Sequence, residues 1–279
     1  MLLSALDSRI RQSLLKTDIR TTFSLVVMAY GQGVERTIAE ALRVSPDLLV
    51  VMAASLADEA HRQAAQIPIV FKTAFDPVAT GLVETAIRPG RNMTGYSNHV
   101  ALYEKRWELM AQAVPNLRRI GVLLNQTYYS SISGKFPAKL PGGIDVVLLK
   151  WHSDEGLPRL EQLMRMGRID ALDVGHGVLP PAQAGALIDW ALGKKIPTMF
   201  YARWYVERGG LLAYEAIELD RVKMLSDYVV EILHGSSAGG LPVSSPNRFS
   251  TSINAHTAKI LDIRPPSAFL KRIDYWKSD

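Results

Sequence analysis

Continuous apolar runs alternate along the chain with segments in which apolar residues recur every three or four positions. The runs are rich in β-branched residues and predict buried strands at residues 23–29, 47–54, 67–74, 118–124, 144–150, 169–175, 196–201 and 210–215. The periodic segments predict helices at residues 33–44, 55–65, 77–87, 101–113, 156–166, 181–193 and 218–234. Near the start of the chain, Leu3, Leu6, Ile10 and Leu14 also fit one face of a helix.

The order of these elements indicates an α/β protein. The predicted strands are apolar throughout rather than alternating, which is typical of strands covered on both faces. Repeated strand–helix units predict parallel sheets with helices on both sides. Two such series, joined near residues 95–119, predict two similar doubly wound parallel-sheet lobes.

The composition of the chain argues against several other classes of protein. The 279 residues are 48% hydrophobic, which is enough for two domain cores. The net charge of +5 comes from scattered Lys and Arg, so no nucleic-acid interface is predicted. The absence of cysteine rules out disulfides and thiol chemistry. No apolar run reaches the roughly 18 residues of a membrane span. Residues 1–17 carry charges where a secretion signal needs an apolar stretch.

Ligands of open parallel sheets bind beyond the carboxyl ends of the strands, so candidate ligand contacts are expected there. Ser55 and Asp76 hold equivalent positions after two predicted strands. Each is predicted to cap the helix that follows, and Pro77 suits the first turn of such a helix. The N–H groups of two helix starts, with the hydroxyls of Ser55 and Thr73, would also suit a carboxylate. Asp76 would attract an ammonium, so an amino acid would fit these groups together.

Aromatic residues and one histidine also lie at or just after predicted strand ends: Tyr128, Tyr129, His176, Tyr201, Trp204, Tyr205 and Tyr214. The aromatic side chains either stack on a flat ligand or pack on neighbouring helices, and the sequence leaves both alternatives open. His176 is either a ligand contact or a surface residue.

Enzyme signatures are absent from the sequence. There is no GxSxG elbow, no GxxxxGK[ST] loop and no HExxH pair, and YGQG at residues 30–33 lacks the third glycine of a dinucleotide loop. We therefore predict no catalytic residue, no metal site and no cofactor.

Several stretches of the sequence are distinctive when taken together. The most specific is IPIVFKTAFDPVATGLVETAIRPGRNMTGYSN. The others are PDLLVVMAAS, KRWELMAQAVPNLRRIGVLLN, GGLLAYEAIELDRVKMLSDYVVEILHG, LPVSSPNRFSTSIN and TAKILDI. Over most of residues 33–275, these stretches resemble the ABC-transporter substrate-binding protein family that includes tryptophan- and tyrosine-binding members.

The resemblance implies a type I periplasmic-binding-protein fold, in which a small ligand is held between two lobes joined by a hinge of three crossings. We place the crossings near residues 97–102, 214–217 and 242–249. Lobe I is expected to hold residues 1–116 and 217–241, and lobe II residues 117–216 and 242–279. Family members normally open with a signal peptide and a central strand. This chain begins at the following helix, so either its start is misassigned or another segment fills the place of that strand.

The resemblance also implies a function: a non-catalytic solute-binding component of an ABC importer. It implies an amino acid or similar carboxylate as ligand, a membrane permease as partner, a monomeric state and an extracytoplasmic location. A ligand-sensing module with the same fold is the alternative, and an enzyme on this fold is a third. The expected ligand contacts are Ser55, Thr73, Ala74, Asp76, Asn98, Asn125, Tyr128, His176, Tyr201 and Tyr214.

Overall fold

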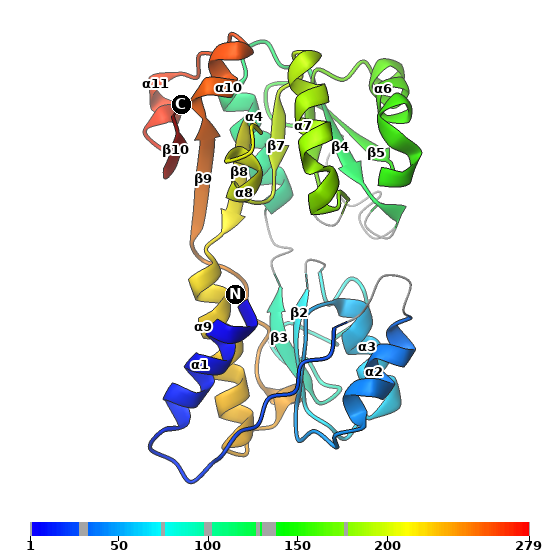
Figure 1. Ribbon diagram of the computed structural model, residues 1–279, viewed down its shortest axis with the longest axis vertical. Helices are drawn as coiled ribbons and strands as arrows, with labels where there is room; N and C mark the ends of the chain where they lie inside the picture. The colour runs from blue at the N-terminus through cyan, green and yellow to red at the C-terminus, as the bar shows by residue number, and fades with distance from the viewer. Residues whose placement is uncertain are drawn as a thin grey trace. The chain divides into compact units, whose positions relative to one another are not determined.

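The computed structural model describes residues 2–27, 33–73, 76–97, 102–126, 129, 138–175 and 178–278. It divides the chain into two compact units (Figure 1). Unit 1 holds Met1–Val100 and Ala216–Arg248, and unit 2 holds Ala101–Glu215 and Phe249–Asp279. The chain therefore passes from one unit to the other three times, and each passage falls within one of the segments predicted for a crossing.

The units differ from the predicted lobes at residues 101–116, at residue 216 and at residues 242–248. Helix α4 (Leu102–Ala113) was expected in lobe I but lies in unit 2, because its buried Arg106 and Trp107 bond to Asp173 there. Residues 242–248 were expected in lobe II but lie in unit 1. They do so because Ser244 pairs with strand β3 and accepts a hydrogen bond from Ser97 N at 2.9 Å.

Unit 1 is built on a three-stranded parallel sheet in the order β1-β2-β3. Its strands are β1 (Leu49–Val51), β2 (Ile69–Thr73) and β3 (Met93–Ser97). The helices that cover it are α1 (Leu2–Leu14), α2 (Val34–Leu42), α3 (Ala54–Gln63) and α9 (Glu218–Leu233), and a short turn, η3 (Ala238–Gly240), follows α9.

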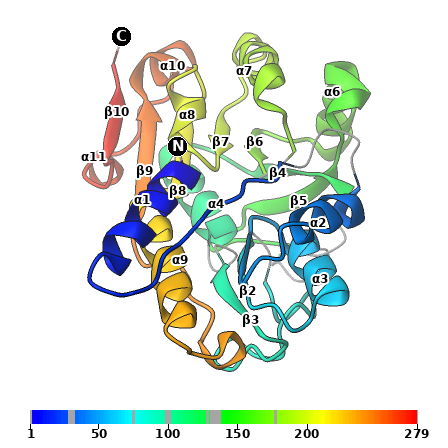
Figure 2. The same ribbon diagram turned by 60° about the horizontal axis from the view of Figure 1, so that its bottom comes forward.

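Side chains of β2 are buried on both faces of this sheet, as the apolar run predicts. Ile69 and Phe71 join one core cluster with residues of α2 and α3. Val70 points to the other face and joins a cluster with residues of α1 and α9. The two helix layers lie on opposite sides of β2 and β3 (Figure 2). The alternation of side chains along a strand is therefore what requires helices on both faces.

The predicted strand at residues 23–29 does not form over its described part, residues 23–27. Phe23, Leu25 and Val27 are instead 39%, 64% and 69% exposed. A strand needs a neighbour for its backbone N–H and C=O groups, and the described residues give β1 no partner other than β2. The strand propensity of residues 23–27 is therefore not sufficient to form a strand. Residues 28 and 29 lie outside the described part.

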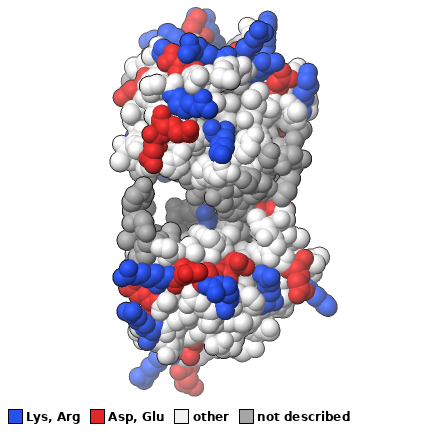
Figure 3. Space-filling view, turned by 90° about the vertical axis from the view of Figure 1, so that its right-hand side faces the viewer, with Lys and Arg blue, Asp and Glu red and all other residues white. Residues whose placement is uncertain are grey.

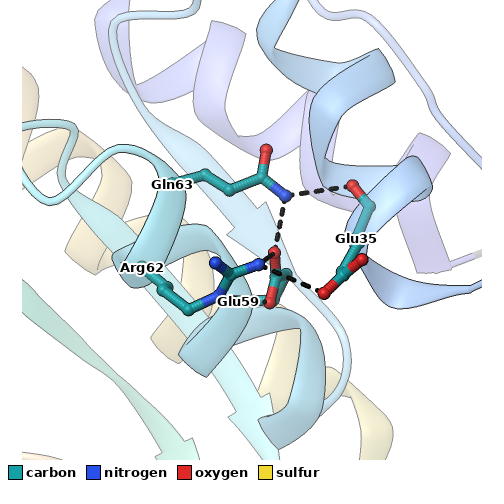
Figure 4. A network of polar contacts seen from close by, with 4 residues as sticks. All are labelled: Glu35, Glu59, Arg62 and Gln63. Atoms are coloured by element: carbon teal, nitrogen blue, oxygen red, sulfur yellow. Dashed lines mark hydrogen bonds and ion pairs between the residues drawn. The ribbon is translucent and has the colours of Figure 1, made fainter.

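A network of polar side chains joins α2 to α3 (Figure 4). Arg62 bonds to both carboxylate oxygens of Glu59, at 2.6 and 3.0 Å, and contacts Glu35 at 3.3 Å. The amide of Gln63 donates to Glu59 at 2.6 Å and to the carbonyl of Glu35 at 3.0 Å. These bonds from Arg62 and Gln63 stabilise the charged form of Glu59 and lower its pKa.

On the side shown in Figure 3, acidic and basic side chains are interspersed.

Glu59→Gln should remove part of the pH dependence of folding. Because the folded-state pKa of Glu59 is lowered, its stabilising effect is complete above the ordinary Glu pKa of about 4.3 and is lost as the pH falls through the folded value. We expect the wild type to exceed the variant in unfolding free energy at pH 7, and the difference to shrink toward pH 3. Urea titrations followed by circular dichroism measure it. A difference that does not change with pH would contradict the assignment.

Unit 2 is built on a seven-stranded sheet in the order β10-β9-β8-β7-β6-β4-β5. The strands are β4 (Arg119–Leu124), β5 (Asp145–Lys150), β6 (Ala171–Val174), β7 (Thr198–Phe200), β8 (Leu212–Ala216), β9 (Phe249–Asn254) and β10 (Tyr275–Lys277). Neighbours among β4–β8 are parallel, and β9 is parallel to β10. Ile217 N bonds to Arg248 O and Asn254 N to Leu211 O, so β8 and β9 run antiparallel.

Helices cover both faces of this sheet as well. Leu172 and Val174 of β6 pack with residues of α6 (Gly156–Gly167), α7 (Ala184–Gly193) and α8 (Arg203–Val206). Asp173, between them, points to the opposite face and contacts α4. The remaining elements are the turns η1 (Ser153–Glu155) and η2 (Pro181–Gln183) and the helices α10 (Ala255–Ile260) and α11 (Ser267–Leu270). The α/β prediction with helices on both faces is confirmed.

Candidate ligand-binding residues at the sheet edges

Hydroxyl side chains end two neighbouring strands of unit 1. Thr73 is the last residue of β2 and Ser97 the last of β3, and the two are register partners. Neighbouring strands lie about 4.8 Å apart, so both hydroxyl groups belong to one small part of the carboxyl edge of the sheet. Both side chains are buried, at 1% and 2% exposure. Thr73 was predicted as a ligand contact, whereas Ser97 was not singled out.

Ser55 follows β1, as expected, but does not cap α3. The helix begins at Ala54, its cap position is Ala53, and this cap residue makes no side-chain hydrogen bond to the first turn. Ser55 is therefore the second residue of the helix, and its side chain is exposed. The prediction of a Ser55 cap is wrong because Ala54 also adopts helical geometry. The first N–H groups of α3 thus have no side-chain cap at the edge of β1.

Asp76 caps a single turn rather than a helix. Its Oδ1 accepts hydrogen bonds from Val78 N at 2.9 Å and Ala79 N at 3.1 Å. Its carbonyl accepts from the N–H of Thr80 at 3.0 Å and from the Thr80 hydroxyl at 2.9 Å. None of the described residues donates to Oδ2, and the side chain is half-buried. Asp76 therefore keeps one carboxylate oxygen for another partner.

The helix predicted at residues 77–87 is replaced by turns. The chain folds back when Val83 N bonds to Pro77 O at 3.1 Å, and this brings Leu82 and Val83 into the core. Val78 and Ile87, two further apolar residues of the predicted helix, are 42% and 77% exposed. The helix prediction is wrong because the turns already bury Leu82 and Val83 in the core, and no helix is needed to do so.

In unit 2, candidate residues follow β4 and β7, which lie on either side of β6. Asn125 comes directly after β4, and its carbonyl accepts a hydrogen bond from Tyr129 N at 2.9 Å. Gly175 follows β6 and donates its N–H to Leu123 O at 3.0 Å. A Cβ at Gly175 would lie 2.6 Å from that oxygen, so only glycine lets the chain after β6 pass so close to β4.

The aromatic residues after β7 pack mainly on one another. The Tyr205 ring stacks on the Phe200 ring, with centroids 4.6 Å apart. The Trp204 ring meets the Tyr205 ring edge-on, with centroids 4.8 Å apart. Burial and a hydrogen bond to Tyr201, with hydroxyl oxygens 2.7 Å apart, raise the pKa of Tyr205. These contacts support the packing alternative for Trp204 and Tyr205. Tyr201 itself remains half-buried at the strand end.

Tyr214 lies on β8 and its ring stacks on Phe249 of β9, with centroids 5.2 Å apart. Its side chain is half-buried. Four further predicted contacts, namely Ala74, Asn98, Tyr128 and His176, lie outside the described residues.

A buried charged cluster was missed at the sequence level. Arg106 and Trp107 of α4 bond to the two carboxylate oxygens of Asp173, the latter at 2.7 Å. Arg106 is 2% exposed and Asp173 fully buried. The Tyr103 ring lies 4.7 Å from the guanidinium carbon. A charged residue inside an apolar strand run was the available signal, and it pointed to a buried partner.

Part of the chain matches a known protein family. Residues 10–137 match the family described as ABC transporter substrate binding protein. This match confirms the predicted resemblance.

Three known proteins resemble the chain over most of its length. A tyrosine-binding protein from Clostridioides difficile (strain R20291) is 27% identical over 250 residues, covering 84% of this chain and 67% of that protein. An ABC domain in complex with L-Trp from Streptococcus pneumonia is 20% identical, with a TM-score of 0.79, and the match covers 99% and 96% of the two chains. A conserved domain protein from Vibrio cholerae is 25% identical, with a TM-score of 0.77 and coverage of 98% and 96%.

These likenesses confirm the type I periplasmic-binding-protein fold predicted from the resemblance. The matched family is one of substrate-binding proteins rather than enzymes. None of the helices that the structure describes is long and apolar enough to cross a membrane.

Proposed function

We propose that this protein is the solute-binding component of an ABC importer and that its ligand is an aromatic amino acid. The observation that carries the proposal is the alignment of 84% of the chain with a tyrosine-binding protein. The protein acts without catalysis, as a monomer outside the cytoplasm, and delivers its ligand to a membrane permease. The alternative of a ligand-sensing module requires the same binding chemistry and differs only in the partner.

The carboxyl edge of the unit 1 sheet supplies groups that suit the polar end of an amino acid. The side-chain carboxylate of Asp76 is held in place by the hydrogen bonds that its Oδ1 accepts, and its Oδ2 is available for an ammonium group. The uncapped first turn of α3 offers N–H groups and the positive end of a helix dipole to a carboxylate. Thr73 and Ser97 add hydroxyl groups nearby. In unit 2, Tyr201 and Tyr214 are the described aromatic side chains proposed to contact the ring.

Asp76→Asn should separate ligand recognition from capping. Asn is as good a cap as Asp, because its side-chain oxygen accepts the same N–H bonds, so we expect stability to stay within about 0.5 kcal/mol of the wild type. The loss of the charge should weaken L-tyrosine binding about 10- to 100-fold, the size expected for one charge-assisted hydrogen bond. Isothermal titration calorimetry measures the affinity, and urea titration measures the stability.

Two matched probes sharpen this test. Tyramine keeps the ammonium of tyrosine but lacks the carboxylate, and 3-(4-hydroxyphenyl)propionate keeps the carboxylate but lacks the ammonium. Asp76→Asn should weaken the binding of tyramine and should not weaken that of the propionate, because the substitution removes a negative charge that attracts an ammonium and repels a carboxylate. Equal affinity of wild type and variant for L-tyrosine would reduce Asp76 to a cap. The absence of binding to any aromatic amino acid would overturn the proposed ligand class.

A further inference from the structure

Unit 2 has a cavity of about 290 Å³ among α10, α11, β10 and the segment between the two helices. Its walls are mostly apolar and are formed by Ile253, Ala258, Ile263, Leu270 and Trp276. The first three side chains are buried, whereas Trp276 is 45% exposed and leaves much of its indole ring in contact with water. A large apolar side chain exposed beside a hollow indicates a surface that a ligand could cover.

This cavity lies at the opposite edge of the sheet from the candidate residues of unit 2. Strands β9 and β10 run antiparallel to β4–β8, so their carboxyl ends meet the amino ends of those strands. Asn125 and Tyr201, by contrast, follow the carboxyl ends of β4 and β7. A strand as long as β4 spans roughly 20 Å. The cavity is therefore separate from the proposed amino-acid contacts of this unit.

Hydrogen bonds hold the walls of the cavity in place. Asn254 caps α10 by accepting from Thr257 N at 2.9 Å, and its own amide donates to Val206 O at 2.9 Å. Lys195 bonds to the carbonyl of Ile260 at the other end of α10, at 2.6 Å. Asp274 accepts from Thr251 N at 2.7 Å directly before β10 begins. A ligand would therefore meet a preformed site and would have little protein motion to restrict.

The charged residues that line the cavity carry a net positive charge. They are Lys259, Arg264 and Asp262, and Lys259 forms no ion pair with any described residue. Arg264 approaches Asp262 only at 3.9 Å, and both side chains are about nine-tenths exposed, at 92% and 89%. Such an exposed pair is weak, so Arg264 can turn toward an anion. Its guanidinium can bind a carboxylate through two parallel hydrogen bonds.

We propose that this cavity binds a small aliphatic carboxylate, with its chain against Ile253, Ile263 and Trp276 and its carboxylate at Lys259 and Arg264. The volume is at the lower limit of small-ligand pockets, which favours a chain of about six to eight carbons. The proposal does not depend on the proposed amino-acid function, because it rests on a different edge of unit 2.

Octanoate is the probe, and Trp276 gives the signal. We expect a saturable blue shift in tryptophan fluorescence as the chain covers the exposed indole ring, and Trp276→Phe should lose it. From butanoate to octanoate, each added methylene should strengthen binding about fourfold. Octanol, which has no charge, should bind at least tenfold more weakly than octanoate.

Two variants of the full chain test the two halves of the site. The double substitution Lys259→Gln with Arg264→Gln should weaken octanoate binding at least tenfold and leave octanol binding unchanged. Ala255→Leu should fill the cavity and abolish binding, with circular dichroism confirming that the fold persists. L-tyrosine titration should give the same affinity in all three proteins. A response without saturation, without dependence on chain length, or equal in wild type and variants would overturn the proposal.

Discussion

Replacing Arg106 by Met should lower the free energy of unfolding of unit 2 by about 3–5 kcal/mol, the cost of breaking a buried ion pair from one side. Asp173 is fully buried, and Arg106 and Trp107 are its partners. Without Arg106, its carboxylate would keep only the bond from Trp107 among the described residues. Met preserves most of the arginine stem, so the loss reports the charge rather than the packing.

The deficit of Arg106→Met should grow with pH. Burial raises the pKa of Asp173, and Arg106 opposes that rise. Once Arg106 is removed, the folded-state pKa should lie further above the unfolded value. The stability that the protonated acid retains is then present at low pH and is lost as the pH rises through the folded pKa. Urea titrations at pH 5 and pH 8 should therefore give the larger deficit at pH 8.

Tryptophan fluorescence gives this measurement a local readout, because all five tryptophans belong to unit 2. A matched control is the double variant Arg106→Met with Asp173→Leu, which removes both charges and should recover most of the lost stability. A single variant that loses less than 1 kcal/mol would show that the pair is not buried as described. A double variant as unstable as the single one would assign the loss to packing instead.

The cluster also explains why one boundary could not be predicted from the sequence. Helix α4 follows the first crossing directly, so its position along the chain allows either unit. Its assignment to unit 2 depends on Asp173, which lies 67 positions after Arg106 in the sequence. Nothing in the local pattern of residues 101–113 specifies that contact.

Elements with a strong local period were predicted well, and the failures have a common cause. Strands β4–β8 and helices α6, α7 and α9 were found within a few residues, because their apolar runs and periods are long. Residues 23–27 were predicted as a strand but lack a described neighbour. Strand β3 was missed because MTGYS is not an apolar run, although all of it is buried. In each case the outcome depends on a partner distant in sequence.

The candidate site shows the same limit at the level of single residues. Strand order was enough to place Thr73 and Asp76 at the end of the same strand, and Asn125 and Tyr201 beyond two others. The sequence could not tell which oxygen of Asp76 would be engaged by its own backbone, or that α3 would begin one residue before Ser55. Those details depend on backbone geometry that varies within one turn.

Gly95→Ala should destabilise unit 1 by roughly 3 kcal/mol, at the upper end of the usual cost of overpacking. Gly95 lies in the middle of β3 and pairs with Phe71 of β2. A Cβ there would lie 2.0 Å from the carbonyl oxygen of Phe71 and 2.8 Å from its ring. The obstacle is the backbone of the central strand, which cannot turn away as a flexible side chain could. The two strands would have to separate at their hydrogen-bonded register.

Gly240→Ala is the matched control, since it lies in the same unit and a Cβ there meets no atom within 4 Å. It should change stability by less than about 0.5 kcal/mol. Because unit 1 contains no tryptophan, its unfolding is followed by circular dichroism, while fluorescence reports unit 2 in the same sample. We expect Gly95→Ala to move the unfolding of unit 1 to lower urea and to weaken L-tyrosine binding, because Thr73 and Ser97 end the two strands that it separates. A wild-type urea midpoint in Gly95→Ala would mean that β2 and β3 are not in the register described.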